Sequence, residues 1–415
     1  MGKKTDTCSF CGREIRGMFK GLGDAYICYD CIETGHQIVQ EQIAEMQKAA
    51  GAAAAGSGSL SLDSLPAPAK IKSFLDQYVI GQDEAKKYLS VAVYNHYKRI
   101  LQPAGEDGVE IEKSNIILVG STGTGKTLMA RTIAKMLQVP FAMVDATVLT
   151  EAGYVGEDVE STLVRLLQES DYDVAKAEKG IVFIDEIDKI ARKTDNPSIT
   201  RDVSGEGVQQ GLLKLLEGSV VNVPPKGGRK HPEQEFVKVN TQNILFICGG
   251  AFDGIERKIA QRLNTQVVGF EAAQKTQDVD KNNLLQYIAP QDLKSYGLIP
   301  EIIGRLPVLT YLKPLDKAAL RSILTEPKNA IIKQYKKLLA MDGVALDFEP
   351  EALDYIVDKA IEFKLGARGL RGLTETVMMD LMYETPGTGA KQFTVTRAYV
   401  EEKLKKNGRL RTAQV

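Results

Sequence analysis

The sequence predicts an α/β protein in which a parallel sheet is flanked by helices. A smaller, mainly helical domain follows this sheet, and a small cysteine module precedes it. Four of the five cysteines lie within the first 31 residues. From residue 71 onward, short apolar runs alternate with amphipathic helical patterns, as in a sheet built from strand, helix and strand units. After Lys313, helical patterns dominate and strand-like runs become brief.

These patterns divide the chain into four parts. The expected limits are 1–48 for the cysteine module, 49–68 for a flexible linker rich in Ala, Gly, Ser and Pro, 69–312 for the large α/β domain, and 313–415 for the small helical domain. The expected strands of the sheet are residues 116–119, 141–144, 181–184 and 244–247. In the small domain we expect helices at 330–339 and 351–361, with short strand-like pieces at 344–348 and 393–395.

The bulk composition is that of an ordinary soluble protein, and the lack of an apolar secretion segment predicts a cytoplasmic location. A length of 415 residues is enough for about two to four domains. The formal net charge of -1 provides no overall attraction to nucleic acid or to anionic membranes. No apolar run approaches the ~20 residues that cross a bilayer, and the first residues lack an apolar secretion segment. We therefore expect no membrane partner.

The cysteine module has the spacing of a metal site. Cys8 and Cys11 form one Cys-x2-Cys pair, Cys28 and Cys31 form another, and sixteen residues separate the pairs. This pattern is typical of a four-thiolate zinc site, whose binding energy of ~10 to 16 kcal/mol folds modules too small for a core. A cytosolic compartment disfavours two disulfides, and a redox motif needs only one pair. An iron–sulfur cluster stays as an alternative, which a colourless purified protein would argue against.

Residues 120–127, GSTGTGKT, lie between an apolar strand pattern and a helical pattern. Glycines allow backbone N–H groups to surround phosphate oxygens, and the helix that follows adds its positive N-terminal end. Lys126 neutralises the β and γ charges of a nucleoside triphosphate, and Thr127 offers Mg²⁺ a hydroxyl. The expected nucleotide-binding residues are Gly120, Ser121, Thr122, Gly123, Thr124, Gly125, Lys126 and Thr127.

A second apolar strand pattern ends in two carboxylates, Asp185 and Glu186. In a parallel sheet this places both acids at the carboxyl edge, beside the phosphate loop. We expect Asp185 to hold Mg²⁺ through its hydration shell and Glu186 to polarise the attacking water. The presence of both acids argues against the alternative that the protein is a non-catalytic scaffold that only binds nucleotide.

These features resemble the AAA+ ATPases and, within them, the ClpX unfoldases, the regulatory subunits of the ClpXP protease. The likeness covers nearly the whole chain. The motifs that carry it are the cysteine module, Tyr78-Val-Ile-Gly-Gln82, the phosphate loop, Phe183-Ile-Asp-Glu-Ile-Asp188, Gly304-Arg-Leu-Pro307 and Gly366-Ala-Arg-Gly-Leu-Arg371. The resemblance implies an AAA+ fold with ATP and Mg²⁺ as cofactors, and Zn²⁺ in the cysteine module.

The resemblance also implies roles for individual residues around the nucleotide. Val79 and Ile80 are expected to line the adenine pocket, and Arg368 to reach the γ-phosphate as the second sensor. Arg305 is expected to act as an arginine finger in a neighbouring subunit's site, which requires an oligomer and agrees with the family's homohexameric ring. Many AAA+ proteins carry a polar first sensor near the end of the fourth strand, but here that region reads Phe-Ile-Cys248-Gly-Gly. No first-sensor residue is assigned, and Cys248 itself is interpreted as a buried small apolar residue.

Two loops would contact substrate by the same resemblance. Tyr154 and Val155 lie between two glycines, where ClpX-like proteins carry the axial pore loop. The tyrosine offers a broad apolar face that grips a polypeptide without reading its sequence. Arg229, Lys230 and His231 match the second pore-facing loop, where they would attract acidic or carboxylate-bearing tags.

A third loop would bind the peptidase. Val268, Gly269 and Phe270 stand where the family carries the Ile-Gly-Phe tripeptide that docks on ClpP. Valine keeps the β-branch of isoleucine and loses one methylene, which is a mild departure.

The sequence therefore predicts an ATP-dependent protein unfoldase and translocase. It would thread tagged or unfolded proteins into a ClpP-type peptidase, act as a chaperone without it, and bind adaptor proteins through the zinc module. We expect no peptidase activity of its own, because His36, His96 and His231 belong to no HExxH or nucleophile-elbow motif. The alternative is a DNA-directed AAA+ motor or loader with a zinc nucleic-acid reader. Near-neutral charge and an aromatic pore loop argue against it.

Overall fold

The computed structural model describes residues 7–14, 19–20, 25–33, 61–102, 109–150, 157–192, 205–224, 236–265, 280, 283–385 and 391–406. They belong to two compact units, Met1–Ser61 and Leu62–Val415. In the described part of the chain, no helix is both long and apolar enough to cross a membrane.

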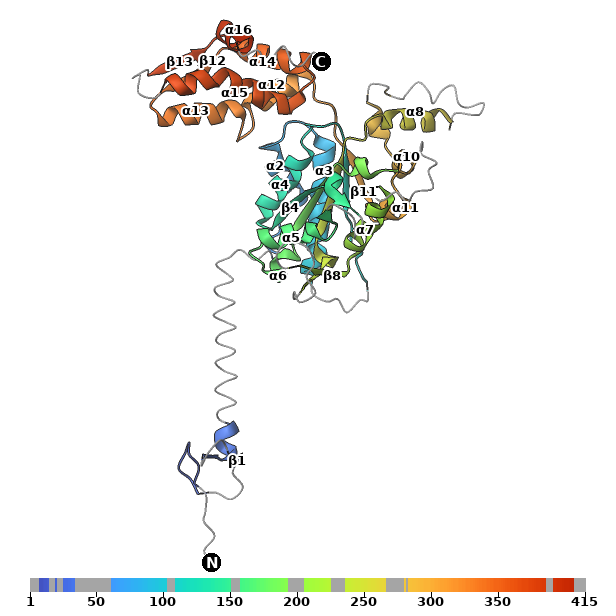
Figure 1. Ribbon diagram of the computed structural model, residues 1–415, viewed down its shortest axis with the longest axis vertical. Coiled ribbons are helices and arrows are strands. Elements are labelled where there is room, and N and C mark those ends of the chain that lie inside the picture. Colours follow the sequence, from blue (N-terminus) through green and yellow to red (C-terminus); the bar gives the residue numbers. More distant parts are fainter. Residues whose placement is uncertain are drawn as a thin grey trace, which may run out of the picture. The chain divides into compact units, whose positions relative to one another are not determined.

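A five-stranded parallel sheet forms the centre of the large α/β domain (Figure 1). Its strands, in chain order, are β3 (Ile116–Val119), β4 (Phe141–Asp145), β7 (Ile181–Asp185), β10 (Leu245–Gly250) and β11 (Val308–Tyr311). In space their order is β11-β3-β10-β7-β4, and every ladder is parallel. All four residues of β3 are fully buried, which explains why the central strands read as continuous apolar runs. The predicted parallel sheet is confirmed.

Helices surround this sheet. They are α2 (Pro68–Asp76), α3 (Asp83–Leu101), α4 (Lys126–Leu137), α5 (Ser161–Glu169), α6 (Val174–Ala177), α7 (Glu206–Glu217), α8 (Ile255–Thr265), α10 (Pro290–Tyr296) and α11 (Pro300–Gly304). Short 3-10 turns lie between them, at η1 (Ala146–Val148), η2 (Ile187–Ile190), η3 (Thr241–Asn243) and η5 (Leu284–Tyr287). Asp173 caps α6 by accepting a hydrogen bond from the N–H of Lys176, as expected for an N-cap carboxylate.

Two small strand pairs accompany the main sheet. Strands β8 (Val220–Val223) and β9 (Val237–Asn240) form an antiparallel pair, and β5 (Leu149–Thr150) pairs with β6 (Glu157–Asp158). Neither pair was predicted, because four or fewer residues with mixed burial give no clear period in the sequence.

Strand β10 corrects the sequence prediction of a strand at 244–247. It continues through Cys248, Gly249 and Gly250, which pair in register with Ile117, Leu118 and Val119 of β3. Glycine is required at the last two positions. A Cβ on Gly249 would lie 2.7 Å from the Phe183 ring, and a Cβ on Gly250 would lie 2.5 Å from the Phe252 ring. Their small size lets aromatic side chains pack against the strand, although two adjacent glycines look like a strand end in the sequence.

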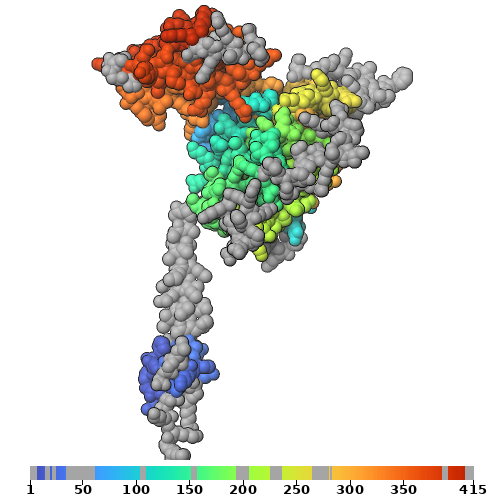
Figure 2. All heavy atoms as spheres, in the orientation of Figure 1, coloured from blue at the N-terminus to red at the C-terminus, as the bar shows by residue number. Residues whose placement is uncertain are grey.

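The small C-terminal domain is mainly helical, as predicted, and Figure 2 shows its orange and red residues as one packed body. Its elements are α12 (Lys317–Thr325), α13 (Ile331–Met341), β12 (Ala345–Phe348), α14 (Pro350–Glu362), α15 (Gly366–Glu384), β13 (Gln392–Val395) and α16 (Arg397–Lys406). Leu324, Leu339, Ile356 and Val377 are fully buried in a core of its own. The two strands pair in parallel, and each boundary differs from the prediction by two residues or fewer.

Candidate nucleotide site and metal centre

A cavity of about 480 Å³ opens beyond the carboxyl ends of β3 and β7. The connection leaving β3 runs toward β4, whereas the later connections return in the opposite direction and pass β3 to reach β11. Such a reversal leaves a crevice at the carboxyl edge of a parallel sheet. One wall of the cavity is the phosphate loop with the acids after β7. The other wall comes from α13 and α15 of the small domain, through residues such as Gln334 and Arg368.

The phosphate loop joins β3 to α4 with two left-handed residues, Gly123 at φ 86° and Gly125 at φ 106°. Only glycine adopts such angles without strain, so the loop can turn its backbone N–H groups inward. Helix α4 begins at Lys126, whose Nζ donates hydrogen bonds to the carbonyls of Gly120 and, at 3.1 Å, Ser121. Burial lowers the pKa of Lys126, and the nearby carboxylate of Asp185 acts against that shift. The loop therefore holds a largely buried cation at the N-terminal end of a helix, as an anion site requires.

Strand β7 brings Asp185 and Glu186 to the same edge. Thr127 Oγ1 donates a hydrogen bond to Asp185 Oδ2 at 3.2 Å, and the backbone N–H of Glu186 donates to Asp185 Oδ1 at 3.0 Å. Glu186 adopts a left-handed conformation at φ 57°, and its side chain is exposed. A hydroxyl beside a carboxylate offers the hard oxygen donors that Mg²⁺ prefers. The predicted residue pair is thus suited to a metal–nucleotide complex.

The second-sensor candidate lies at the same cavity. Arg368 lines the cavity from α15, and its backbone N lies 3.8 Å from where a Cβ on Gly123 would be. The adenine-pocket candidates are placed differently. Val79 is buried beside the loop, with its Cγ1 3.6 Å from the Cβ position of Gly125, while Tyr78 rather than Val79 or Ile80 is among the described lining residues.

Arg305 does not lie at this cavity. Its carbonyl accepts a hydrogen bond from Asn115 Nδ2 at 2.9 Å, and its side chain pairs with Glu217 at 3.1 Å. Asn115 immediately precedes β3, and Arg305 precedes β11, so both residues lie at the amino edge of the sheet. The cavity opens at the opposite, carboxyl edge.

Several charged residues that line the cavity have no role predicted from the sequence. Asp188, Lys189, Asp253 and Arg371 belong to this group. Lys189 lies 3.3 Å from Asp188 and 3.8 Å from Asp253, and the charge of Asp188 raises the pKa of Lys189. For Asp188, the spacing Asp185-x-x-Asp188 could have predicted a place at the site. A 3-10 turn directly after a strand brings its second residue back toward the carboxyl edge of the sheet, where the strand ends.

The candidate substrate and peptidase residues lie outside the described part of the chain. They are Tyr154, Val155, Arg229, Lys230, His231, Val268, Gly269 and Phe270.

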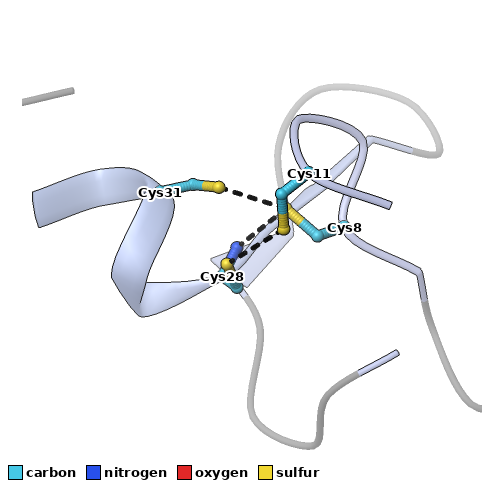
Figure 3. A group of neighbouring side chains, drawn as sticks. All are labelled: Cys8, Cys11, Cys28 and Cys31. Atoms are coloured by element: carbon cyan, nitrogen blue, oxygen red, sulfur yellow. Dashed lines mark hydrogen bonds between the residues drawn. The ribbon is translucent and has the colours of Figure 1, made fainter. Parts of the chain in front are cut away.

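The N-terminal unit brings its four cysteines together (Figure 3). Strands β1 (Phe19–Lys20) and β2 (Tyr26–Ile27) form an antiparallel pair between the two cysteine pairs. The Sγ atoms of Cys8, Cys11, Cys28 and Cys31 all lie within 4.8 Å of one another. The Cys8–Cys31 and Cys11–Cys28 sulfur distances are 3.9 and 3.7 Å. Four Zn–S bonds of ~2.3 Å in a tetrahedron give sulfur separations of about 3.8 Å, so the geometry fits one zinc ion.

Close packing of the four cysteines shifts the pKa values of two of the thiols in opposite directions. Backbone hydrogen bonds, first that from Cys11, lower the pKa of the Cys8 thiol to about 6. Hydrogen bonding to the neighbouring sulfurs, first Cys28, raises the pKa of Cys31 to about 12. All four cysteines are free of disulfides. Cys248 is separate from them, fully buried in β10, and burial raises its pKa to about 12, as expected for an inert core thiol.

The fold and the cavity together define an AAA+ ATPase. Residues 111–309 match the AAA domain (Cdc48 subfamily), and residues 315–396 match the C-terminal, D2-small domain of ClpB protein. The chain belongs to the ClpX family, because residues 6–41 match the ClpX C4-type zinc finger and whole-length relatives carry that name. It is therefore an ATPase that uses ATP with Mg²⁺ and holds Zn²⁺ in its cysteine module.

Three of these relatives are each named ATP-dependent Clp protease ATP-binding subunit ClpX. The protein of Bacteroides thetaiotaomicron is 68% identical over 407 residues, covering 97% of both chains. That of Bacteroides fragilis is 68% identical over 411 residues, covering 98% of both. The Porphyromonas gingivalis protein is 64% identical over 409 residues, covering 97% of this chain and 98% of its own.

Proposed function

We propose that this chain is an ATP-driven unfoldase and translocase of the bacterial cytoplasm. It forms a homohexameric ring, unfolds tagged or unfolded protein substrates, threads them into a ClpP-type peptidase, and acts as a chaperone without it. The observation that carries this proposal is the cavity at the phosphate loop, which is lined from both the large and the small domain. A nucleotide bound there contacts both domains, so its hydrolysis can change how they meet.

The proposed chemistry assigns one task to each residue around the nucleotide. When bound, Mg²⁺ neutralises charge on the β- and γ-phosphates. Thr127 and Asp185 position that ion, Lys126 contacts the phosphates, and Arg368 adds a positive charge from the small domain. Glu186, exposed at the cavity, accepts a proton from the attacking water.

The position of Arg305 supports an oligomer. At the amino edge of the sheet, Arg305 cannot reach the phosphate loop of its own subunit at the carboxyl edge. An arginine finger acting on a transferring phosphoryl group must then come from a neighbouring subunit. The exposed ion pair with Glu217 is weak enough to exchange for such a contact.

Force would reach the substrate through the pore loops. Tyr154 and Val155 grip the polypeptide, and Arg229, Lys230 and His231 attract acidic tags. A tyrosine that buries ~150 to 250 Å² gains some 4 to 6 kcal/mol at best, at ~25 cal/mol per Å². A marginally stable domain is held by ~5 to 15 kcal/mol, so repeated pulling by a few loops is sufficient to unfold it.

The remaining parts complete the proposal. The zinc module, residues 1–48, recruits adaptors or substrates, and residues 49–68 tether it to the large domain at 69–312. The small domain at 313–415 closes the nucleotide cavity. Val268, Gly269 and Phe270 dock on the peptidase.

The decisive experiment measures ATP-dependent loss of a tagged fluorescent protein, with and without a ClpP-type peptidase. We expect unfolding in both cases and degradation only with the peptidase. Phe270→Ala should keep unfolding and lose degradation, which separates docking from the motor. ATP turnover that rises with DNA but not with unfolded protein would instead support a DNA-directed motor.

A further inference from the structure

The end of strand β10 carries no polar side chain toward the nucleotide. After Cys248 come Gly249, Gly250 and Ala251, and Cys248 is fully buried within the sheet. Many AAA+ proteins place an Asn or Thr first sensor here. The described residues supply another polar group at this place, from the turn that follows the neighbouring strand β7.

Asp188 reaches this position from the turn after β7. Its Oδ1 accepts a hydrogen bond from the backbone N–H of Ala251 at 3.1 Å. A Cβ on Gly250 would lie 2.8 Å from that same oxygen, so the glycine makes room for the carboxylate. The side chain is 1% exposed, yet Asp188 lines the nucleotide cavity. Its second oxygen, Oδ2, is buried and forms an ion pair with Lys189 Nζ at 3.3 Å, but it has no hydrogen-bond partner among the described residues.

A buried carboxylate oxygen without a hydrogen bond is costly, and proteins keep such groups mainly where a ligand or an ordered water completes them. An ionised carboxylate only accepts hydrogen bonds, and so do phosphate oxygens. Asp188 therefore cannot bind a phosphate directly, as an Asn or Thr sensor does. It can accept a hydrogen bond from a water that lies between it and the nucleotide.

We propose that Asp188 occupies the first-sensor position of this ATPase and holds an ordered water at the γ-phosphate end of the cavity. Ala251 orients one carboxylate oxygen and Gly250 provides the space, which leaves the other oxygen to accept a hydrogen bond from the water. This inference rests on the proposed ATPase site. It adds a residue that senses the nucleotide through water instead of by direct contact.

The test compares Asp188→Asn with Asp347→Asn in the full-length protein. Both changes remove one negative charge that pairs with a lysine, but Asp347 lies in β12 of the small domain, is not among the lining residues of the cavity, and pairs with Lys336 at 2.8 Å, which makes it the control. Three quantities are measured: the steady-state kcat for ATP, the Kd for Mg·ATP at equilibrium in a Glu186→Gln background, and the thermal midpoint without nucleotide. Asp188→Asn should lower kcat on the order of 10- to 100-fold, leave the Kd unchanged or tighter, and preserve the midpoint. Asp347→Asn should hydrolyse ATP normally.

Two results would overturn the inference. One is normal hydrolysis by Asp188→Asn while Glu186→Gln is inactive. The other is a loss of ATP binding or of thermal stability in proportion to the loss of kcat, which would make Asp188 a structural residue. If Asp188→Asn does not fold, Asp188→Ser decides the matter, because its hydroxyl can still accept from Ala251. Full hydrolysis by Glu186→Gln would refute the proposed ATPase site itself, a separate failure.

Discussion

Thr127 Oγ1 donates a hydrogen bond to Asp185 Oδ2 across 3.2 Å, although 58 positions separate the two residues in the sequence. The contact joins the first turn of α4 to the carboxyl end of β7, the two elements that position a metal–nucleotide complex. It brings together the two oxygen ligands that sequence analysis assigned separately to Mg²⁺.

Glu186→Gln should bind ATP and assemble, yet hydrolyse ATP at least ~100-fold more slowly than the wild type, because the amide cannot accept a proton from water. The backbone N–H contact to Asp185 remains, so the strand end keeps its shape. Phosphate release and equilibrium ATP binding are the two measurements. Near-normal phosphate release would remove Glu186 from the proposed chemistry.

Arg305→Ala should lose on the order of 10³-fold or more in hydrolysis while still binding ATP. Because the finger acts on a neighbour, mixing Arg305→Ala with Glu186→Gln subunits should restore part of the activity. The Arg305→Ala subunit keeps its own Glu186 and receives an arginine from its neighbour. A partner carrying both changes is the control and should restore nothing, and recovery with this control would contradict a finger supplied in trans.

Tyr154→Ala should hydrolyse ATP but lose unfolding of a stable tagged protein, since the remaining methyl offers little apolar surface to grip a chain. Tyr154→Phe is the matched variant and should unfold normally, because it keeps the ring. Fluorescence loss of the tagged substrate and phosphate release are followed together. Normal unfolding by the alanine variant would refute the pore-loop assignment.

Cys28→Ser should release zinc from the N-terminal module and make residues 1–48 sensitive to protease. ATP hydrolysis should persist, since residues 62–415 form a separate compact unit. Zinc content per chain and limited proteolysis are the measurements. Cys248→Ala, which changes the buried cysteine of β10, should keep about one zinc per chain. Equal zinc content in Cys28→Ser and the wild type would contradict the four-thiolate site.

His96 should make the large domain sensitive to acid. Burial lowers its pKa to about 3, its Nε2 donates to the carbonyl of Asn243 at 3.1 Å, and Nδ1 has no partner among the described residues. Between pH 6.5 and 3 the unfolded state binds a proton that the folded state does not, so stability falls as pH falls through that window. Between pH 7 and pH 5 this effect lowers the free energy of unfolding by about 2 kcal/mol. His96→Gln should unfold in urea with a correspondingly smaller pH dependence, and parallel pH profiles would refute this reading.

Motifs that are contiguous in the chain could be interpreted without a structure. The phosphate loop, the acids after β7 and the two cysteine pairs each carry their chemistry within a few residues. Strand β11 (Val308–Tyr311) was not predicted, because its four residues become a strand by pairing with β3. The sequence pattern predicted the end of β10 three residues too early. Gly249 and Gly250 still pair with β3, and their lack of a side chain leaves space for neighbouring aromatic rings.

The sequence by itself determined the class of protein, its cofactors and the residues of each local motif. Each motif consists of a few neighbouring residues, which set both the local backbone conformation and the chemistry of the side chains. Only the tertiary structure decided where those motifs meet. The parallel pairing of β11 with β3 places Arg305 at the amino edge of the sheet, opposite the phosphate loop, and the pairing of β10 with β7 brings Asp188 to the backbone N–H of Ala251. Both relations depend on pairing between strands far apart in the chain, which no local pattern records.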